Sequence, residues 1–386
     1  MRSETDLRIG VIGVGGRGRL AAQAHRPGQG SRLVAGADVS ADALTQFAEA
    51  YPDARTFTDY RAMLAEVALD AVFIASPDYL HEEHAVAALS RGIAVYLEKP
   101  MAITIEGCDR ILAAAAATQA KLYVGHNMRH MPFVREMKRL IDSGAIGAVK
   151  AAWCRHFIAY GGDAYFKDWH SQRRYVNSLL LQKAVHDIDV LHWLCGGQTE
   201  RVVGMGGLTL YDQVPARRGE DDRGNTKWSD DHWPPMTQQG LSPQIDVEDL
   251  NHLLLRLDNG VLVTYQQCHY TPDAWRNYTI IGTAGRIENA GTEPGACEIR
   301  IWNQRTHYNE QADERIAIPP LEGSHGGADP LIVAEFLRYV RDDVPTAISP
   351  EAARAAVAAA AMGAESVRAD SAPRQVPAYA GVAPGL

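Results

Sequence analysis

The sequence predicts an α/β protein, with an N-terminal Rossmann-type, doubly wound parallel sheet followed by a C-terminal α+β domain that has a large, mainly antiparallel open sheet. Two observations predict this. Up to residue 125, short apolar segments alternate with segments of helical composition, the pattern of βα units that build a parallel sheet. From about residue 148, β-branched and aromatic segments follow one another between turn residues, which is typical of antiparallel strands. The division is expected at residues 127 and 128, giving domains 1–127 and 128–386.

In the first domain the apolar runs are the expected strands, and the helices lie between them. Strands are predicted at 7–13, 32–37, 70–75, 93–97 and 121–125. Helices are predicted at 17–25, 41–51, 59–66, 81–91 and 104–119. The last helix contains five consecutive alanines from Ala113 to Ala117, and alanine has the highest helix propensity.

In the second domain the expected strands are the alternating segments at 148–157, 200–211, 249–258, 261–270 and 276–288. The turn Asp258-Asn259-Gly260 between two of them predicts a hairpin. Helices are predicted at 179–195, 329–341 and 349–368, and the tail 371–386, rich in Pro, Gly and Ala, is expected to be extended.

The strongest functional indication is the first apolar run, which leads into Gly13-Val-Gly15-Gly-Arg-Gly18, with Asp38 twenty residues later at the end of the second run. In a strand–turn–helix context, the first glycine makes the tight turn, the second lets the backbone approach a pyrophosphate, and the third lets the helix pack against the strand. A carboxylate at the end of the second strand can accept hydrogen bonds from the adenosine ribose and repels a 2′-phosphate. The pattern therefore predicts a dinucleotide site that favours NAD over NADP.

Composition excludes several other classes. The net charge is −9 and no basic run occurs, which argues against a nucleic-acid partner. The five cysteines include no Cys-x-x-Cys pair, and the pair His81 and His84 has no apparent third ligand, so no metal site is expected. No stretch is apolar for long enough to span a bilayer, and the N-terminal residues lack the apolar core of a signal peptide, so a cytoplasmic setting is the expectation.

A long segment, 212–246, is expected to be an insertion loop in the second domain. It is rich in Pro, Gly and charges but carries Trp228, Trp233 and Met236. Long loops in compact domains are usually functional or disordered. The tryptophans favour packing against the active site or a partner subunit, while a mobile surface excursion is the alternative.

Two titratable side chains are candidates for catalysis. Lys99, in Glu98-Lys99-Pro100, follows a predicted parallel strand, and ligands of doubly wound sheets lie beyond the carboxyl ends of the strands. His186 lies on a predicted helix with Gln182 one turn before it, an arrangement that suits a general base. The alternatives are a solvated lysine at a strand end and a structural histidine. Ser76-Pro77-Asp78, after another strand, offers a hydroxyl to the cofactor.

Several motifs together give the chain a family resemblance. They are Gly13-x-Gly15-x-x-Gly18, Ser76-Pro77-Asp78-x-x-His81, Glu98-Lys99-Pro100, Val124-Gly-His-Asn127-Met-Arg129, Ile141-Asp-Ser-Gly-Ala-Ile-Gly147, Val185-His186-Asp-Ile-Asp189 and Ile281-Gly-Thr-Ala-Gly-Arg286-Ile-Glu288. Between residues 7 and 370 the chain resembles the glucose–fructose oxidoreductase, inositol dehydrogenase and rhizopine-catabolism (Gfo/Idh/MocA) family. The resemblance implies a Rossmann domain, a second domain whose open sheet packs against another subunit, and oxidation of a ring hydroxyl with NAD or NADP.

The resemblance also implies the site residues. Lys99 and His186 are the expected catalytic pair. The expected cofactor-binding residues are Gly13, Gly15, Gly16, Arg17, Gly18, Asp38, Ser40, Ser76, Pro77, Asp78, His81, Glu98, Lys99 and Asn127. The expected substrate-binding residues are Lys99, Arg129, Tyr160, Asp168, Trp169, Gln182, Lys183 and His186. Gln182 stands where the family often has Asp, and because an amide cannot take up a proton, it is expected to bind substrate instead.

The expected activity is NAD-dependent oxidation of a ring hydroxyl of a sugar, sugar derivative or cyclitol, a small polyhydroxylated substrate. The alternatives are a lyase or glycosidase that passes through a transient keto-sugar, and a non-catalytic sensor of sugar and NAD. Strands such as 249–258 and 261–270 carry apolar or aromatic side chains on both faces, and a large uncovered apolar face normally marks an interface, with residues 249–288 expected at its centre. A homodimer, or a tetramer of dimers, is therefore expected to form through this sheet.

Overall fold

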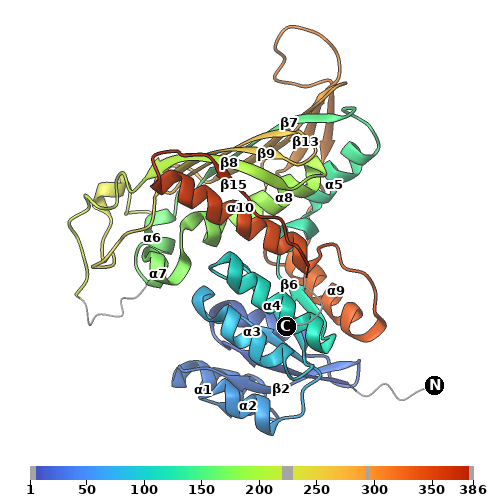
Figure 1. Cartoon of the computed structure of the whole chain (residues 1–386), viewed down its shortest axis with the longest axis vertical. Coiled ribbons are helices and arrows are strands. Elements are labelled where there is room, and N and C mark those ends of the chain that lie inside the picture. The colour runs from blue at the N-terminus through green and yellow to red at the C-terminus, as the bar shows by residue number, and fades with distance from the viewer. Residues whose placement is uncertain (1–5, 220–228, 293–294, 382–386) are drawn as a thin grey trace. The chain divides into compact units, whose positions relative to one another are not determined.

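The structure is a computed structural model that describes residues 6–219, 229–292 and 295–381 (Figure 1). The chain divides into two compact units. Unit 1 contains the residues up to 130, residues 323–354 and the residues from 379 on, and unit 2 contains residues 131–322 and 355–378. Unit 1 therefore includes a segment of the second half of the sequence, whereas the predicted boundary placed everything after residue 127 in the second domain.

The sheet of unit 1 is a doubly wound parallel sheet. Within the described residues its strands are β1 (Leu7–Ile12), β2 (Ser31–Ala37), β3 (Arg55–Phe57), β4 (Ala71–Ile74), β5 (Ala94–Leu97) and β6 (Leu122–Val124). Their order is β3-β2-β1-β4-β5-β6 and each pairing is parallel. The order reverses at β1, and ligands of doubly wound sheets bind beyond the carboxyl ends of the strands at such a point. β4 and β5 are buried along their whole length because helices cover both faces.

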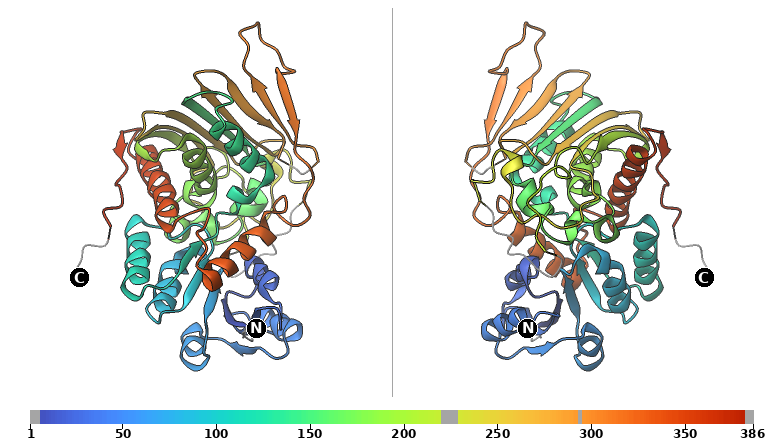
Figure 2. Two further views of the ribbon diagram at one scale, coloured as in Figure 1. Left: turned by 90° about the vertical axis from the view of Figure 1, so that its right-hand side faces the viewer. Right: turned by 90° about the vertical axis from the view of Figure 1, so that its left-hand side faces the viewer.

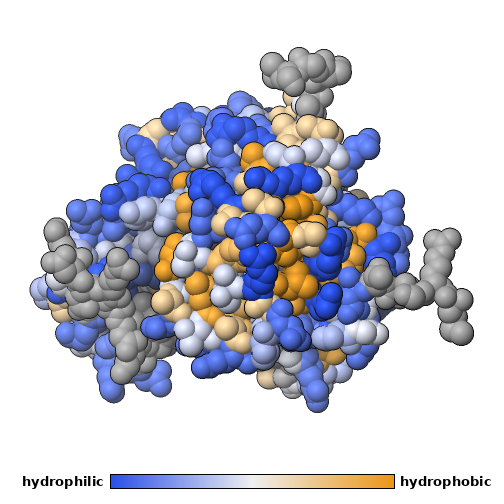
Figure 3. Space-filling view, turned by 90° about the horizontal axis from the view of Figure 1, so that it is seen from below, coloured by the Kyte–Doolittle hydropathy of each residue, from blue (hydrophilic) through white to orange (hydrophobic). Residues whose placement is uncertain are grey.

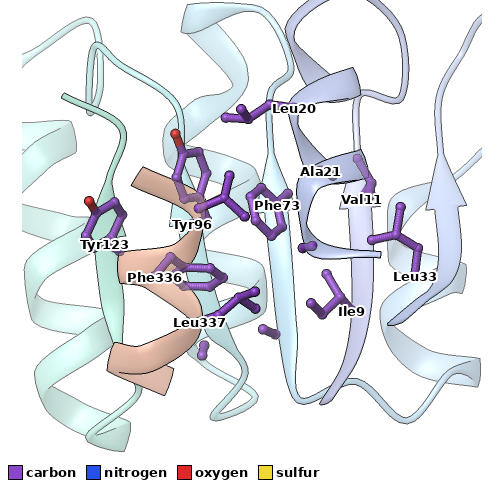
Figure 4. Packing of buried hydrophobic residues seen from close by; sticks show 14 of the residues in the cluster. Ile9, Val11, Leu20, Ala21, Leu33, Phe73, Tyr96, Tyr123, Phe336 and Leu337 are labelled. Carbon is purple, nitrogen blue, oxygen red and sulfur yellow. The ribbon is translucent and has the colours of Figure 1, made fainter. Parts of the chain in front are cut away.

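The helices of unit 1 are η1 (Gly16–Ala24), α1 (Ala41–Ala50), α2 (Tyr60–Glu66), η2 (Asp78–Leu80), α3 (His81–Leu89), α4 (Ile105–Thr118), η3 (Asn127–His130) and α9 (Ala328–Asp342). The helix α9 joins this unit through its apolar face. Phe336 packs edge-on against Phe73 of β4, with ring centroids 5.2 Å apart, and also contacts Tyr96 of β5 and Tyr123 of β6 (Figure 4). Burial of these rings makes α9 part of the Rossmann core.

Unit 2 is built on a nine-stranded sheet in the described residues. Its strands are β7 (Val149–Phe157), β8 (Thr199–Gly207), β9 (Leu250–Leu257), β10 (Leu262–Cys268), β11 (Trp275–Gly282), β12 (Arg286–Ala290), β13 (Glu298–Trp302), β14 (Glu314–Ala317) and β15 (Arg374–Gln375). Their order is β14-β13-β12-β11-β7-β10-β9-β8-β15. Only the β7–β10 pair among the described strands is parallel. The predicted mainly antiparallel sheet is confirmed.

Helices cover one face of this sheet (Figures 1 and 2). The helices of unit 2 within the described residues are α5 (Pro132–Asp142), α6 (Gly161–Tyr165), η4 (Trp169–Ser171), α7 (Arg173–Val176), the π-helical turn η5 (Leu180–Ala184), α8 (Val185–Cys195), η6 (Pro235–Thr237) and α10 (Pro350–Arg368), whose first residues belong to unit 1. α5 and α8 contact the sheet, and Gly204 of β8 lies against Gly363 of α10. The side chains of β9 alternate accordingly, with Leu253 buried and Leu254 60% exposed.

Some predicted elements differ from the structure. The segment 276–288 is two antiparallel strands, β11 and β12, because Thr283, Ala284 and Gly285 form a turn that the apolar composition concealed. The predicted helix after Gly13 is a 3₁₀ helix, and α5, β3, β13 and β14 were not anticipated. The predicted hairpin at Asp258-Asn259-Gly260 is confirmed by the antiparallel pairing of β9 and β10, with Gly260 at φ +83°.

Figure 3 shows one face on which hydrophobic residues gather between hydrophilic ones. Among the described residues, none of the helices combines the length and the apolar character that a membrane crossing requires.

Candidate functional site

The glycine turn after β1 has the geometry that a pyrophosphate requires. Gly13 has φ +84°, and a Cβ atom there would lie 2.8 Å from backbone atoms of Ala75. A Cβ atom at Gly18 would lie 1.8 Å from the carbonyl oxygen of Gly13. At Gly16 a Cβ atom would meet nothing within 4 Å, and at Gly15 only Ala43 lies near, at 3.7 Å. The turn is therefore tight where the backbone packs and open where a phosphate would approach.

Asp38, at the end of β2, lies beside this turn. Its Oδ2 accepts hydrogen bonds from the backbone N–H groups of Val14 (2.9 Å) and Gly15 (3.4 Å), and its Oδ1 accepts one from Ser40 (2.9 Å). Ser40 in turn caps α1, since its hydroxyl accepts a hydrogen bond from the N–H of Ala43. The structure therefore places the predicted acid and the predicted serine next to the glycine turn.

Arg17 points toward the opposite half of the sheet. Its Nε donates to Glu98, which follows β5, at 2.8 Å, and its two Nη atoms donate to the carboxylate of Asp329 on α9, at 2.7 and 2.9 Å. Burial opposes the charge of Arg17, but Glu98 and Asp329 raise the pKa of the guanidinium. Because β1 and β4 separate Glu98 from Asp38 in the sheet, the charge of Arg17 is directed away from the side where a 2′-phosphate would lie.

Asp329 is a residue that the sequence did not single out, and it gathers donors from several elements. Besides Arg17, its carboxylate accepts hydrogen bonds from Ser324 (2.5 Å), from the Nδ1 of His325 (2.9 Å) and from the side-chain amide of Asn127 (3.3 Å). Burial alone would raise the pKa of Asp329, but the hydrogen bonds from His325, Arg17 and Ser324 lower it. The glycine cluster at 323–327 before a predicted helix is the feature of the sequence that could have drawn attention to this segment.

The Ser76-Pro77-Asp78 loop after β4 is tied to the Glu98-Lys99-Pro100 loop after β5. The two ring nitrogens of His81 lie 2.7 Å from the carbonyl oxygen of Pro100 and 2.8 Å from that of Ser76. The hydroxyl of Ser76 lies 2.8 Å from Nδ1 of His84, and burial lowers the pKa of His84 to about 4. His81 thus fixes the two loops relative to each other, and direct cofactor contact by His81 stays a prediction.

Other predicted residues of unit 1 have protein partners as well. Glu98 also accepts hydrogen bonds from the backbone N–H of Lys99 (3.2 Å) and from the hydroxyl of Tyr96 (3.3 Å). Arg129 is buried and donates to the carbonyl oxygen of Ala347 at 2.8 Å. This contact positions the end of η3, so its role toward substrate stays a prediction.

In unit 2 the candidate base His186 lies in the first turn of α8, directly after the π-helical turn η5. π-helical turns are rare and occur often at functional sites. Because η5 has i→i+5 hydrogen bonds, the α-helical spacing expected between Gln182 and His186 is interrupted there. Lys183, in the π turn, lies 3.4 Å from the hydroxyl of Tyr160, and its ammonium lies 5.7 Å from the centre of that ring. Burial raises the pKa of Tyr160.

The residue after the candidate base, Asp187, anchors the helix in the sheet. Its fully buried carboxylate accepts hydrogen bonds from Nδ1 of His156 on β7 (2.8 Å), from the hydroxyl of Tyr265 on β10 (3.0 Å) and from Tyr278 on β11, and it pairs with Arg276 (3.2 Å). Burial would raise the pKa of Asp187, but Arg276 and His156 lower it. Burial and then Arg276 lower the pKa of His156 to about 3. The cluster therefore holds one anion, one cation and a neutral imidazole.

The insertion 212–246 packs on its own unit where the structure describes it. Asp163 of α6 accepts hydrogen bonds from His232 and Gln238 of the insertion, each at 2.8 Å, and from Lys167 at 2.6 Å. Val214 and Leu241 are buried in the same hydrophobic cluster as Tyr165 and Phe166, whereas Trp233 and Met236 are about half exposed. Residues 220–228, including Trp228, lie outside the described residues.

Asp168 and Trp169 lie in a local turn. The Oδ1 of Asp168 accepts a hydrogen bond from the backbone N–H of His170 at 3.0 Å and lies 2.5 Å from Nδ1 of the same residue. The ring of Trp169 stacks on that of His170, with centroids 3.8 Å apart. These contacts order the turn, and substrate binding by Asp168 and Trp169 stays a prediction.

Comparison with known proteins decides the family. Residues 7–126 match the oxidoreductase family with an NAD-binding Rossmann fold, and residues 138–376 match its C-terminal alpha/beta domain. The chain belongs to the Gfo/Idh/MocA oxidoreductase family. The two matched regions together cover most of the chain, so the resemblance read from the motifs is confirmed.

Individual relatives share about a third of their residues with this chain over the aligned part. YteT of Bacillus subtilis (strain 168), described as an oxidoreductase, is 29% identical over 306 residues, which are 69% of this chain and 72% of YteT. Inositol 2-dehydrogenase of Burkholderia multivorans (strain ATCC 17616 / 249) is 35% identical over 196 residues, which are 49% of this chain and 55% of that enzyme. The chain thus aligns with about half of the length of that dehydrogenase.

Solved structures share the fold. Levoglucosan dehydrogenase in complex with NADH and levoglucosan has a TM-score of 0.78 at 20% identity, with 97% of this chain and all of that chain (100%) covered. Myo-inositol 2-dehydrogenase from Lactobacillus plantarum has a TM-score of 0.73 at 19% identity, with the same coverage. At these identities the likeness establishes the two-domain architecture.

Proposed function

We propose that this chain is an NAD-dependent dehydrogenase of a sugar, a sugar derivative or a cyclitol. The observation that carries the proposal is the arrangement at the carboxyl edge of the parallel sheet. The glycine turn is open to a pyrophosphate at Gly15 and Gly16, and Asp38 lies beside it where an adenosine ribose would bind. The relatives named for inositol oxidation support the substrate class.

The residues of this chain would share the chemistry as follows. His186 takes the proton of the substrate hydroxyl as general base. Lys99 hydrogen-bonds the same oxygen and stabilises the negative charge that develops there. Bound NAD would supply the hydride acceptor. Lys183 beside Tyr160 adds a positive charge and an aromatic face, which suit a strongly polar substrate with exposed C–H groups.

The preference for NAD follows from charge. The carboxylate of Asp38 would repel the 2′-phosphate of NADP, and Arg17, the basic residue of the turn, is paired with Glu98 and Asp329 instead of facing Asp38.

The substrate is identified by incubating the protein with NAD and a panel of sugars and inositols and following NADH absorbance. Product formed without net NADH would instead indicate the lyase or glycosidase reaction. Binding without any turnover would indicate a sensor.

We also propose that the protein self-associates through the uncovered face of the nine-stranded sheet. Four neighbouring strands present exposed apolar side chains there, namely Met205 (68% exposed), Leu254 (60%), Leu262 (59%) and Trp153 (41%). Leu254 and Trp153 lie in one row, since both pair with Thr264 across β10. A second copy packed on this face would remove the row from water.

A further inference from the structure

The segment 323–329, which precedes and begins α9, is joined to the glycine turn by a buried carboxylate. Asp329 is 2% exposed and binds both Nη atoms of Arg17, which stands between Gly16 and Gly18 of the turn. The same carboxylate binds Asn127, the residue that begins η3 after β6. A loop from the far end of the sequence is therefore fixed at the carboxyl edge of the parallel sheet, on the side of β4, β5 and β6.

The backbone of this segment is held in an unusual conformation around one side chain. Gly323, Gly326 and Gly327 have positive φ angles, and His325 between them has φ +51°, a left-handed value that is uncommon for a residue with a Cβ atom. The carboxylate of Asp329 holds His325 through Nδ1 at 2.9 Å, and Ser324 binds the same oxygen. Backbone strain of this kind persists where the surroundings fix it and clusters at ligand sites.

The imidazole of His325 is directed to solvent on its other side. Its side chain is 51% exposed, although Asp329, which holds it, is almost completely buried. Nδ1 is engaged, and Nε2 has no hydrogen-bond partner among residues 6–219, 229–292 and 295–381. The arrangement is a histidine oriented by a carboxylate, with one nitrogen presented outward beside a turn that is open to a phosphate.

We propose that His325 is a cofactor-binding residue whose Nε2 contacts the cofactor on the nicotinamide side. Because Nδ1 donates to Asp329, Nε2 accepts a hydrogen bond from a ribose hydroxyl when the imidazole is neutral and donates one to the pyrophosphate as the imidazolium. The inference rests on the proposed use of NAD. His325 and Arg17 share the Oδ2 atom of Asp329, so the imidazole lies next to the residue that forms the turn. Asp329 is then the positioning residue that ties both groups together.

The test is equilibrium binding in the absence of substrate, measured by NADH fluorescence and, for AMP, by calorimetry. The variant His325→Ala should weaken NADH binding about tenfold, the value expected for loss of one hydrogen bond to a charged group. Binding of AMP, which occupies the adenosine half alone, should change less than about twofold. Gln119→Ala is the matched control, because Gln119 also has a left-handed backbone (φ +57°) but lies at the end of α4. It should leave NADH binding unchanged.

A second variant at the same position distinguishes an effect on binding from a folding defect of His325→Ala. His325→Asn keeps a side chain that tolerates the left-handed backbone but is too short to reach past Asp329, so it should also weaken NADH binding. Unchanged NADH binding in a folded His325 variant, or an equal loss for AMP, would overturn the inference. If the wild-type chain bound no NADH, the cofactor proposal and this inference would both fall, whereas a failed substrate screen leaves the binding result intact.

Discussion

The buried cluster around Asp187 gives the sharpest test of how unit 2 holds the candidate base. Asp187→Asn removes the negative charge but keeps the shape of the side chain. The carboxylate has no exposed surface, and Arg276 lies 3.2 Å away with its own side chain 15% exposed. The substitution leaves the guanidinium buried without its counter-charge, and breaking a buried pair in this way costs about 3–5 kcal/mol.

The assay is urea unfolding followed by tryptophan fluorescence. All seven tryptophans lie between residues 153 and 302, within the sequence of unit 2, so their emission reports on this unit. The expected loss in the free energy of unfolding of Asp187→Asn corresponds to a fall of about 1–2 M in the urea midpoint. Asp142→Asn is the control, because Asp142 is 58% exposed and pairs with Lys138 one turn earlier on α5, where such pairs contribute about 0–1 kcal/mol.

Two further measurements separate charge from packing. The double variant Asp187→Asn with Arg276→Met removes both charges, so its loss of stability should be smaller than the sum of the single losses by about 1 kcal/mol or more. A single-variant loss below about 1 kcal/mol, or strict additivity, would refute the argument. Because His186 precedes Asp187 in the chain, Asp187→Asn should also lower turnover while NADH binding persists.

The same cluster makes unit 2 sensitive to acid. Asp187 has a pKa below its ordinary value of 3.8 in the folded chain, and His156 has a pKa of about 3 against an ordinary value of 6.5. The unfolded chain therefore binds more protons than the folded chain below about pH 6.5, and stability falls as the pH falls. The stability difference between wild type and Asp187→Asn should shrink below about pH 4, where the unfolded chain neutralises Asp187. A difference that stays constant down to lower pH would contradict this assignment.

Three more outcomes are expected. Asp38→Ala should weaken NAD binding and improve the relative use of NADP, and a wild-type protein that turns over faster with NADP than with NAD at equal concentration would contradict the assignment. Lys99→Met and His186→Ala should each lower turnover by roughly 10²–10⁴-fold with NAD binding, followed by fluorescence quenching, nearly unchanged; a variant that keeps most of its activity would lose its assigned role. Light scattering at micromolar concentration should give a dimer or a tetramer, and Leu254→Asp should shift it toward the monomer; the mass of one chain for the wild type would refute the assembly.

The sequence determined the features that depend on neighbours along the chain. Periodicity predicted the βα units of unit 1, and Asp258-Asn259-Gly260 predicted the hairpin of β9 and β10 in unit 2. Both could be predicted because turn chemistry and alternation are local properties. The glycine turn and Asp38 could be read for the same reason, since their spacing is set by one strand–helix–strand unit. The structure brings them together as expected, with Asp38 bound to the N–H of Val14.

The tertiary structure decided which distant residues share a buried charge. Asp329 lies 312 residues from Arg17, and Asp187 gathers side chains from three strands, so neither partnership leaves a pattern in the local sequence. The assignment of α9 to the Rossmann core likewise depends on Phe336 meeting Phe73 and Tyr96, a contact set by packing in space. Local sequence fixes elements and turns through short-range sterics and hydrogen bonds. Pairing of buried charges depends on desolvation, which only the folded chain imposes.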